Sequence, residues 1–336
     1  MSIGGIPMKR MLSGIKPTGQ LHLGNYIGAL SKFVEYQDEY EVIAFIANLH
    51  CITVPQDPEE LKKNLKDCVA LYLACGLDPA KATIFLQTDV MEHAQLGFIL
   101  CCNTYLGELN RMTQFKDKQA KGEKNLSGGI YTYPSLMAAD ILMYDADYVP
   151  VGEDQKQHVE LCRDIAARFN NKYGETFKLP EPLIPKVGAR IMSLSDPMHK
   201  MSKSDDNGKG CLYLLDDLKK ARKKLMGAVT DSIGKVHFDP VEQPGISNLM
   251  QIMSSLTGKS MDEIEKEFEG QGYGTFKKAV ADVVCAELEK IQNRYNEILN
   301  SDLIETTLAD GKAKAQKYAT AKLEQVQKVL GMNIID

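Results

Sequence analysis

The feature that most constrains this chain lies within residues 11–34, where an apolar segment runs into a glycine-containing loop and then into a helical pattern. Gly14 and Gly19 interrupt the apolar run and allow close approaches that a Cβ would block. From about Gly24 the apolar residues recur at helical spacing. A helix that begins directly after such a loop presents free N–H groups to an anion, and His22 and Asn25 add side-chain donors there. The segment predicts a phosphate site at the end of a strand, with a plain strand-to-helix turn as the alternative.

The composition is that of a globular protein that does not coat nucleic acid. The 336 residues are 44% hydrophobic and 25% charged, and 40 Lys and Arg residues stand against 45 Asp and Glu residues, for a net charge of −5. The eight cysteines form no C-x-x-C pair and are typical of small buried side chains in a reducing compartment. The sequence has no long apolar N-terminal segment and no run of 18 apolar residues, so we expect a cytoplasmic protein without a membrane partner.

Strands and helices alternate in the first half of the chain. Residues 8–14, 41–47 and 82–87 are apolar runs of strand length, and the unbroken run at 41–47 indicates a strand covered on both faces. Asp57 and Pro58 predict the start of a helix that stops at Gly76. Strand, helix and strand in this order predict a parallel sheet. Further along we expect helices over 94–115 and 133–144, a polar loop over 117–129, and a strand over 147–151 that is followed by a helix.

The pattern is helical from residue 216 onward. Apolar residues recur three and four apart within 216–228, 245–256, 260–269, 274–299 and 302–330. Residues 171–215 have the pattern of loops and short strands. We therefore expect an α/β protein with a parallel-sheet domain over residues 1–212 and an all-helical domain over residues 213–336.

Two signature segments carry a family resemblance. Residues 17–25 resemble the first nucleotide-binding signature of the class I aminoacyl-tRNA synthetases, and residues 200–204, Lys-Met-Ser-Lys-Ser, match the second letter for letter. Residues 152–155, Gly-Glu-Asp-Gln, which follow Met-Ala-Ala-Asp at 137–140, are similar to the bacterial tryptophanyl-tRNA synthetases in particular. The resemblance extends from about residue 10 to the C-terminus. It implies a Rossmann-like catalytic domain, with the second signature in a loop near 199–207, and a helical domain that binds the anticodon.

The resemblance also implies a reaction in two steps. Tryptophan is activated with ATP to tryptophanyl-adenylate and pyrophosphate, and tryptophan is then transferred to the 3′ end of tRNA(Trp). The first step needs no protein nucleophile, but it needs donors that hold the reactants in line and neutralise charge on the phosphates. Mg²⁺ is expected to shield the same oxygens. The catalytic role falls to His22, Asn25, Lys118, Lys200 and Lys203.

The expected ATP site draws on both signatures and on the segment after the 147–151 strand. Asp154 suits a ribose hydroxyl because it lies just past a strand end, and the backbone of Ile191 and Met201 suits adenine. No residue is predicted to ligate a metal by itself. The ATP-binding residues are predicted to be Lys16, Gly24, Asn25, Gly152, Asp154, Ile191, Lys200, Met201, Ser202 and Lys203.

The expected amino acid site contains one carboxylate among apolar side chains. Indole has a single polar atom, an N–H donor, and Asp140 supplies an acceptor that would reject analogues without that donor. Tyr133 and Gln155 suit the α-ammonium group. Leu12 and Lys16 stand where many relatives carry an aromatic residue and a glutamine, which bears on the affinity and not on the reaction. The tryptophan-binding residues are predicted to be Leu12, His50, Tyr133, Met137, Asp140, Ile141, Val151 and Gln155.

The implied partners are tryptophan, tRNA(Trp) and a second copy of the chain. The basic run at 219–224 is either a contact for the tRNA backbone or a solvated helix face. Three other functions remain open at this point. One is a tyrosyl-tRNA synthetase with the same architecture, the second is a small-molecule adenylyltransferase that shares the histidine-bearing loop, and the third is a non-catalytic paralogue that senses an amino acid.

Overall fold

The computed structural model describes residues 2–3, 6–17, 19–120, 126–152, 155–183, 190–203 and 208–334. Its strands are β1 (Ser2–Ile3), β2 (Ile6–Pro7), β3 (Arg10–Ile15), β4 (Glu41–Ile46), β5 (Ala82–Leu86), β6 (Tyr148–Pro150) and β7 (Glu181–Leu183). The helices of the first half are α1 (Leu23–Asn25), η1 (Tyr26–Leu30), α2 (Ser31–Tyr36), α3 (Asn48–Cys51), α4 (Pro58–Ala74), η2 (Gln87–Asp89), α5 (Glu92–Cys101), α6 (Leu106–Leu109), α7 (Thr113–Ala120), α8 (Gly128–Leu142) and α9 (Lys156–Tyr173). The helices of the second half are α10 (Leu218–Met226), α11 (Pro244–Thr257), α12 (Met261–Glu267), α13 (Tyr273–Leu299) and α14 (Leu303–Val329).

A five-stranded sheet in the order β5-β4-β3-β6-β7 forms the centre of the molecule. Every neighbouring pair of its strands is parallel. The chain enters the sheet at β3, builds outward to β5, and then returns to add β6 and β7 on the other side of β3. This order, reversed beside the first strand, is that of a Rossmann-like fold. The predicted α/β class is confirmed.

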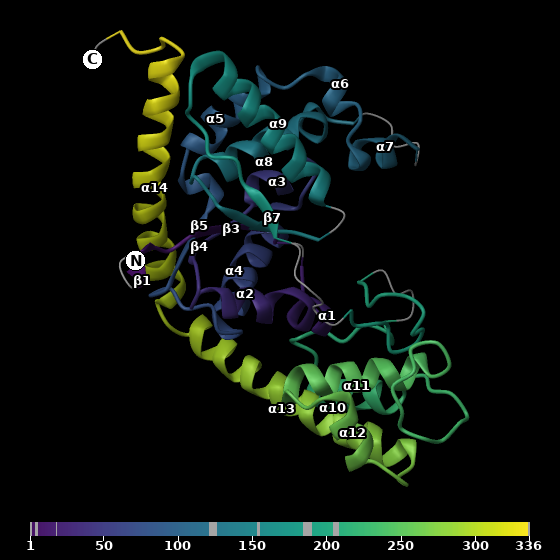
Figure 1. Cartoon of the computed structure of the whole chain (residues 1–336). Helices are drawn as coiled ribbons and strands as arrows, with labels where there is room; N and C mark the ends of the chain where they lie inside the picture. The colour runs from purple at the N-terminus through teal and green to yellow at the C-terminus, as the bar shows by residue number, and fades with distance from the viewer. Residues whose placement is uncertain are drawn as a thin grey trace.

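Alternate side chains of β3, β4 and β5 enter two separate cores. Met11 and Val42 pack with α4 and the helices that follow β3, while Leu12 and Ile43 pack with α5, α8 and α9. Figure 1 shows these two helical layers on opposite faces of the sheet. Because both faces are covered, the strands appear in the sequence as continuous apolar runs.

The helices α10, α11, α12 and the first part of α13 form a second body, which lies below the sheet in Figure 1. Helix α13 contacts both α10 and α11 in this body and also reaches α4 beside the sheet. The five helices expected after residue 216 are confirmed, with ends that agree to within two residues. None of the described helices has both the length and the apolar character needed to cross a membrane.

Helix α14 returns from the helical body and runs along the sheet edge (Figure 1). A Cβ on Gly311 would lie 1.7 Å from the carbonyl oxygen of Ile84 in β5, so only glycine allows this close approach. Further along, Ala315 and Ala319 belong to the core between the sheet, α5 and α8. The division into two domains near residue 212 stays a prediction. Helix α14 belongs to the second of these domains in the sequence but packs against the sheet of the first.

The prediction of one helix over 94–115 is wrong. The chain instead forms α5, α6 and α7, separated by short turns. Helix α5 ends because the side chains of Asn103 and Thr104 donate to the carbonyl oxygens of Ile99 and Leu100, which are groups that a continuing helix would use. The loop expected over 117–129 is shorter than predicted, since α7 extends to Ala120 and α8 begins at Gly128. Residues 121–125 lie outside the described part of the chain.

Candidate active site

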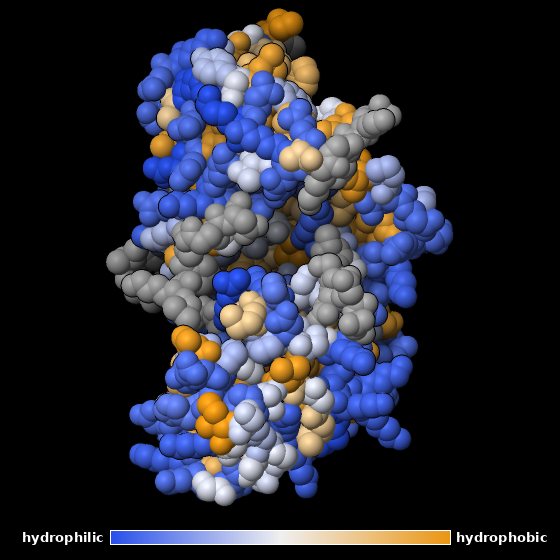
Figure 2. All heavy atoms as spheres, turned by 90° about the vertical axis from the view of Figure 1, so that its right-hand side faces the viewer, coloured by the Kyte–Doolittle hydropathy of each residue, from blue (hydrophilic) through white to orange (hydrophobic). Residues whose placement is uncertain are grey.

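Two cavities lie at the carboxyl ends of β3 and β6, where the strand order reverses. Ser13 in the second half of β3 and Pro150, Val151 and Gly152 at the end of β6 line both of them, so the cavities are neighbours. Ligands of open α/β sheets bind in the crevice at this reversal point. Figure 2 looks onto the side on which α1 and α7 lie in Figure 1, and the surface there is hollowed at mid-height. The position is the one that the glycine-containing loop predicts.

The loop after β3 leads into a helix start that is capped by its own signature residues. His22 is the N-cap of α1, its Nδ1 accepts from the Asn25 N–H at 3.2 Å, and Asn25 Oδ1 accepts from the His22 N–H at 3.2 Å. Because Nδ1 is an acceptor, a neutral His22 has its proton on Nε2, from which it can donate to a ligand. The π-helical turn η1 follows at once, which is a rare geometry that is frequent at functional sites.

The structure brings the two signature segments into contact, although about 180 residues separate them in the sequence. Beyond the second signature, the Leu212 carbonyl accepts from the Leu23 N–H at 2.8 Å, and the Leu214 N–H donates to the Leu21 carbonyl at 2.9 Å. A Cβ on Gly24 would lie 3.5 Å from Cβ of Met201, and a Cβ on Gly19 would lie 3.8 Å from Nζ of Lys203. The lysine-bearing loop therefore lies directly against the glycine-containing loop.

Burial and two cations keep His22 uncharged. Its side chain is only 5% exposed, and burial together with Lys203 and Lys200 lowers the pKa of His22 to about 4. Burial also lowers the pKa of Lys203 below its ordinary value. A neutral histidine beside two lysines offers one uncharged donor and two cationic donors to a phosphate chain. It does so without adding a third positive charge to the ligand-free site.

The smaller cavity, of about 360 Å³, holds half of the predicted ATP residues. Those that line it are Gly24, Asn25, Gly152, Ile191 and Lys200, and Arg190, Gly28, Lys32 and Tyr72 were not predicted. Met201 lies beside this cavity with a buried side chain, and its N–H donates to the Ile191 carbonyl at 3.0 Å. That N–H is therefore used within the protein and is not open to adenine. Asp154 and Ser204 lie outside the described residues.

The lysine-bearing loop is anchored on α11 by a residue to which sequence analysis gave no role. Asn248 is buried; its Oδ1 accepts from the Met192 N–H at 2.8 Å, and its Nδ2 donates to the Met192 carbonyl at 3.0 Å. Met192 in turn forms an antiparallel bridge with Lys200. A signal for Asn248 existed, because the Pro-Gly-Ile-Ser-Asn-Leu segment at 244–249 lies within the part of the chain over which the family resemblance extends.

The larger cavity, of about 560 Å³, is lined by every residue predicted to bind tryptophan. Leu12 and Val151 come from β3 and the end of β6, while Tyr133, Met137 and Asp140 lie on α8. Lys16 and Lys118 also line this cavity. Lys16, which was predicted at the ATP site, therefore lines the larger cavity and not the smaller one. The remaining members of the predicted set that line the larger cavity are His50, Ile141 and Gln155.

Asp140 is the buried acceptor of the larger cavity, with 1% of its surface exposed. Its carboxylate accepts from Gln87 Nε2 at 2.7 Å, His93 Nδ1 at 2.6 Å and His50 Nε2 at 2.8 Å. Burial alone would raise the pKa of Asp140, but the hydrogen bonds from His50 and His93 outweigh it and leave the pKa below its ordinary value. A carboxylate can accept about four hydrogen bonds, so one more donor can be accommodated.

Tyr133 already has partners within the protein. Its hydroxyl donates to Gln114 Oε1 at 2.9 Å and shares a hydrogen bond of 2.5 Å with His158 Nε2. Burial raises the pKa of Tyr133 to about 12, so the phenol stays neutral at physiological pH. Sequence analysis missed Gln87, His93 and His158, because nothing in their local patterns distinguishes them from ordinary buried polar side chains.

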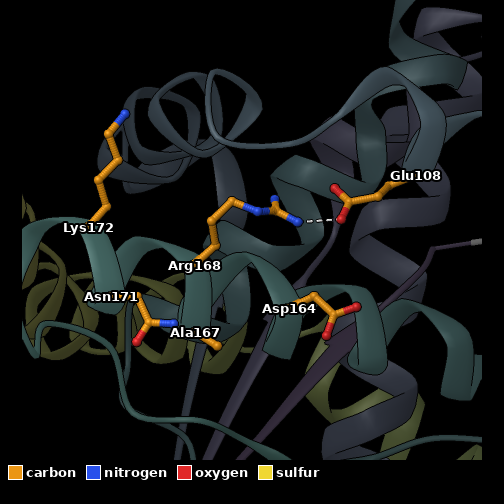
Figure 3. Close-up of a pocket in the computed structure, with 6 residues that line it drawn as sticks. All are labelled: Glu108, Asp164, Ala167, Arg168, Asn171 and Lys172. Carbon is orange, nitrogen blue, oxygen red and sulfur yellow. Dashed lines mark hydrogen bonds and ion pairs between the residues drawn. The ribbon is translucent and has the colours of Figure 1, made fainter.

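A third hollow, of about 500 Å³, lies between α6 and α9 (Figure 3), and none of its lining residues lines either cavity at the strand ends. Arg168 on α9 pairs with Glu108 on α6. Arg168 also donates to the Asn103 carbonyl at 2.6 Å and lies 4.0 Å from the ring centre of Tyr105. These contacts use Arg168 to tie α6 to α9, so we assign this hollow no part in the reaction.

The comparisons with known proteins agree with this geometry. The chain matches the family described as "tRNA synthetases class I (W and Y)" over residues 8–289. Because the match covers most of the chain, the protein belongs to this family of class I synthetases.

Its relatives within the family narrow the comparison further. The tryptophan–tRNA ligase of Caldanaerobacter subterraneus is 51% identical over 329 residues, which are 98% of this chain and 100% of that protein. The tryptophan–tRNA ligase of Listeria monocytogenes is 53% identical over 97% of this chain and 98% of its own length. A solved tryptophanyl-tRNA synthetase from Mycoplasma pneumoniae has a TM-score of 0.86 at 40% identity, with 97% of this chain and 98% of that chain covered. One from Campylobacter jejuni, complexed with ADP and tryptophan, has a TM-score of 0.84 at 37% identity, covering 96% and 99%.

Proposed function

We propose that this chain is a tryptophan–tRNA ligase that activates L-tryptophan with ATP and transfers it to the 3′ end of tRNA(Trp). The observation that carries the proposal is the pair of neighbouring cavities at the reversal point of the sheet. One adjoins a histidine and two lysines, and the other is apolar around a single buried carboxylate. The full-length similarity to tryptophan–tRNA ligases supports the same function.

In the first half-reaction, a carboxylate oxygen of tryptophan forms a bond to the α-phosphorus of ATP. The bond from that phosphorus to the bridging oxygen breaks, and pyrophosphate leaves. No side chain is consumed, so the protein acts by alignment and by charge stabilisation. We assign donation to the phosphates to His22 Nε2, Asn25, Lys200 and Lys203. Lys16 and Lys118 line the amino acid cavity, and we assign them to charge stabilisation next to the reacting groups.

Selection of tryptophan is assigned to Asp140 and the apolar walls around it. The indole N–H donates to the carboxylate, while Leu12, Met137 and Val151 contact the ring. A phenylalanine side chain would leave this buried carboxylate one donor short, and a site of this kind rejects such analogues by ~10⁴–10⁵ in favourable cases. No editing activity is then needed.

The tyrosine alternative is not favoured. Relatives of 51–53% identity over nearly the whole chain are tryptophan–tRNA ligases. A tyrosyl-tRNA synthetase from Archaeoglobus fulgidus shares 21% identity with this chain, which supports the common fold alone. The adenylyltransferase and sensor alternatives are decided by the experiment below.

Mg²⁺ fits this site only when it is bound to the phosphates of ATP. Among the described residues, no group of three or more His, Cys, Asp or Glu side chains lies where it could hold a metal ion. The donors around the smaller cavity are cationic or neutral, which suits phosphate oxygens and not a cation. Mg²⁺ keeps most of its water and is commonly held by substrate phosphates, where it neutralises charge on the leaving pyrophosphate. We therefore propose Mg²⁺ as part of the ATP substrate.

We further propose that the helical part within residues 213–336 reads the anticodon of tRNA(Trp), whose unstacked bases can be recognised individually. The basic run on α10 contributes less than its sequence indicates. Arg222 pairs with Asp282 at 2.6 Å, and Lys224 pairs with Asp216 at 2.8 Å, which leaves the exposed Lys219, Lys220 and Lys223 to meet a phosphate backbone. We place the enzyme in the cytoplasm, where its tRNA and ATP substrates are available.

We also propose a homodimer, because the structure has an exposed apolar surface. Ile52, Met91 and Phe98 are 65%, 78% and 72% exposed, and Ile52 and Phe98 line an apolar groove of about 480 Å³ between α3, α5 and α8. Met91 and Phe98 are seven residues apart and so lie on one face of the α5 region. Apolar patches of this kind are typical of interfaces between subunits.

Amino-acid-dependent exchange between ATP and pyrophosphate, run with each standard amino acid separately, tests the proposed function. We expect exchange with tryptophan and none of comparable rate with tyrosine or phenylalanine. Lys200→Ala and Lys203→Ala should each lower the rate by about 10²–10³, since each removes a donor to the transition-state phosphates. Lys209→Ala removes an exposed lysine of the same region outside the signature and is the matched control.

The outcomes separate the alternatives. Exchange with tyrosine would overturn the assignment of Asp140 as the acceptor that selects tryptophan, and it would favour a tyrosyl-tRNA synthetase. Exchange with no amino acid, with tRNA and Mg²⁺ present, would overturn the enzyme in favour of the sensor. Exchange with tryptophan but no charging of tRNA would favour the adenylyltransferase.

A further inference from the structure

Behind the amino acid cavity, a row of buried polar groups ends on Asp140. The Tyr144 hydroxyl lies 2.7 Å from His93 Nε2, and His93 Nδ1 lies 2.6 Å from Asp140 Oδ1. His93 and Tyr144 are both completely buried, and neither lines the cavity. The row therefore acts on a ligand only through Asp140.

The partners of His93 define where its proton lies. An ionised carboxylate accepts hydrogen bonds and cannot donate, so the Nδ1–H of His93 donates to Asp140. Burial holds the pKa of Tyr144 above its ordinary value and keeps the phenol protonated, so its hydroxyl can donate to Nε2 of a neutral imidazole. These two partners match both nitrogens of the tautomer that carries its proton on Nδ1.

The two oxygens of Asp140 have different neighbours. Oδ1 accepts from His93 and from Gln87, which are both fully buried and lie outside the cavity lining. Oδ2 accepts from His50, which does line the cavity. Oδ2 is therefore the oxygen on the cavity side, and Oδ1 is the oxygen by which the protein holds the carboxylate.

Packing leaves His93 little freedom to move. Its ring lies 5.7 Å from the ring centre of Phe45, 5.9 Å from that of Phe85 and 5.5 Å from that of Tyr144. Gln87, the second donor to Oδ1, is fixed in turn because its Oε1 accepts from the Leu49 N–H at 3.1 Å. The position of the Asp140 carboxylate is thus set by donors from α3, η2 and α5, which are His50, Gln87 and His93.

We propose that His93 is a positioning residue for side-chain selection. It holds Asp140 by Oδ1 so that Oδ2 faces the cavity as an acceptor for the ring N–H of the substrate, and Tyr144 supports it by selecting the tautomer. This inference rests on the proposed activation of tryptophan.

The test measures selectivity for the ring N–H in His93 variants. The substrates are tryptophan and β-(benzo[b]thiophen-3-yl)alanine, which has nearly the same shape but carries sulfur in place of the ring N–H. Pyrophosphate exchange gives kcat/KM for each, and the ratio of the two values reports the hydrogen bond to Asp140. A change in folding or in ATP binding would alter both values equally and leave the ratio unchanged.

Two substitutions form a matched pair. In His93→Asn the amide nitrogen lies near the former Nδ1 and can still donate to Asp140, whereas in His93→Gln it lies near the former Nε2, toward Tyr144. We expect His93→Gln to lower the ratio about 10- to 100-fold, since hydrogen bonds to charged groups have about this effect. His93→Asn should stay within about threefold of wild type. Tyr144→Phe should lower the ratio by a smaller factor, about three- to tenfold.

An unchanged ratio in His93→Gln would overturn the proposal, and so would an equal loss in His93→Asn and His93→Gln. If His93→Gln does not fold, an unchanged ratio in Tyr144→Phe would have the same meaning. These results differ from a failure of the proposed function, in which the wild-type enzyme itself shows no exchange with tryptophan.

Discussion

Two buried titratable side chains, His22 and Asp140, are held in different charge states by their neighbours. His22 stands beside cations and is kept neutral, whereas Asp140 stands among hydrogen-bond donors and is kept ionised. Each state matches the ligand group proposed for it, a phosphate chain for His22 and an indole N–H for Asp140. The chemistry of the site therefore depends on the groups around each residue as much as on the residue itself.

The low pKa of His22 predicts a pH-dependent stability. The unfolded chain binds a proton at His22 near the ordinary pKa of 6.5, and the folded chain does so only near 4. The stabilisation is therefore complete above pH 6.5 and is lost as the pH falls toward 4, with a loss of about 2 kcal/mol between pH 7 and pH 5. Urea unfolding of the wild type and of His22→Gln at both pH values measures it. The variant should lose less stability than the wild type on acidification, and equal losses would contradict the assigned burial.

At the scale of elements, helix α11 supports a loop to which it contributes no ligand-binding side chain. Asn248 holds both backbone groups of Met192, and Met192 pairs with Lys200. Gly245, one turn earlier on α11, lies close to the segment between α10 and α11. A Cβ on Gly245 would be 2.1 Å from the carbonyl oxygen of Val229 in that segment. Asn248 thus links α11 to Met192 at the base of the lysine-bearing loop, and we expect the position of the helix to influence that of Lys200.

Asn248→Ala should loosen this loop. Both Met192 groups would lose their partner, which costs about 1–3 kcal/mol of stability where the groups are buried. Because Lys200 would be held less firmly, we expect kcat of pyrophosphate exchange to fall about tenfold and KM for ATP to rise, with little change in KM for tryptophan. Steady-state exchange kinetics and thermal melting measure these effects.

Ser247→Ala is the matched control for Asn248→Ala. Ser247 is the neighbouring buried residue of α11, and its hydroxyl has no hydrogen-bond partner among the described residues. This variant should keep wild-type kinetics. An Asn248→Ala enzyme that also keeps them would show that Met192 holds the loop without α11.

Over the whole molecule, α13 and α14 connect the helical body to the sheet. The Tyr26 hydroxyl, just past the first signature, donates to Glu287 of α13 at 2.6 Å, and the Tyr295 hydroxyl of α13 donates to Asp67 of α4 at 2.8 Å. Lys322 of α14 is 8% exposed and pairs with Asp145 at 2.8 Å, next to β6. The apolar surface around Phe98 lies outside all of these contacts.

The proposed dimer predicts that a charge on this surface separates the subunits. Phe98→Asp should convert a dimer into a monomer, because a carboxylate would be buried without a partner in the apolar contact. Light scattering during gel filtration over a range of protein concentrations measures the mass. Val241→Asp changes an equally exposed apolar residue, 82% exposed in the segment before α11, and should leave the mass unchanged. A wild-type protein that is monomeric at all concentrations would contradict the proposal.

The sequence by itself determined the features that depend on near neighbours. The apolar runs define β3, β4 and β5, Asp57 caps α4 as expected, and the capped start of α1 follows from the spacing of His22 and Asn25. The residues predicted for the amino acid site all line one cavity because most of them lie at the ends of β3, β4 and β6 or on one face of α8, positions that strand order and helical periodicity define.

Only the tertiary structure decided the features that depend on distant partners. The turns that divide residues 94–115 rest on side chains that compete with the helix for its own carbonyls, and α14 lies on the sheet because Gly311 meets Ile84 from another part of the chain. The donors that hold Asp140 come from positions 50, 87 and 93. None of these contacts leaves a periodic pattern in the sequence, because burial and hydrogen bonding between separate segments arise only when packing brings them together.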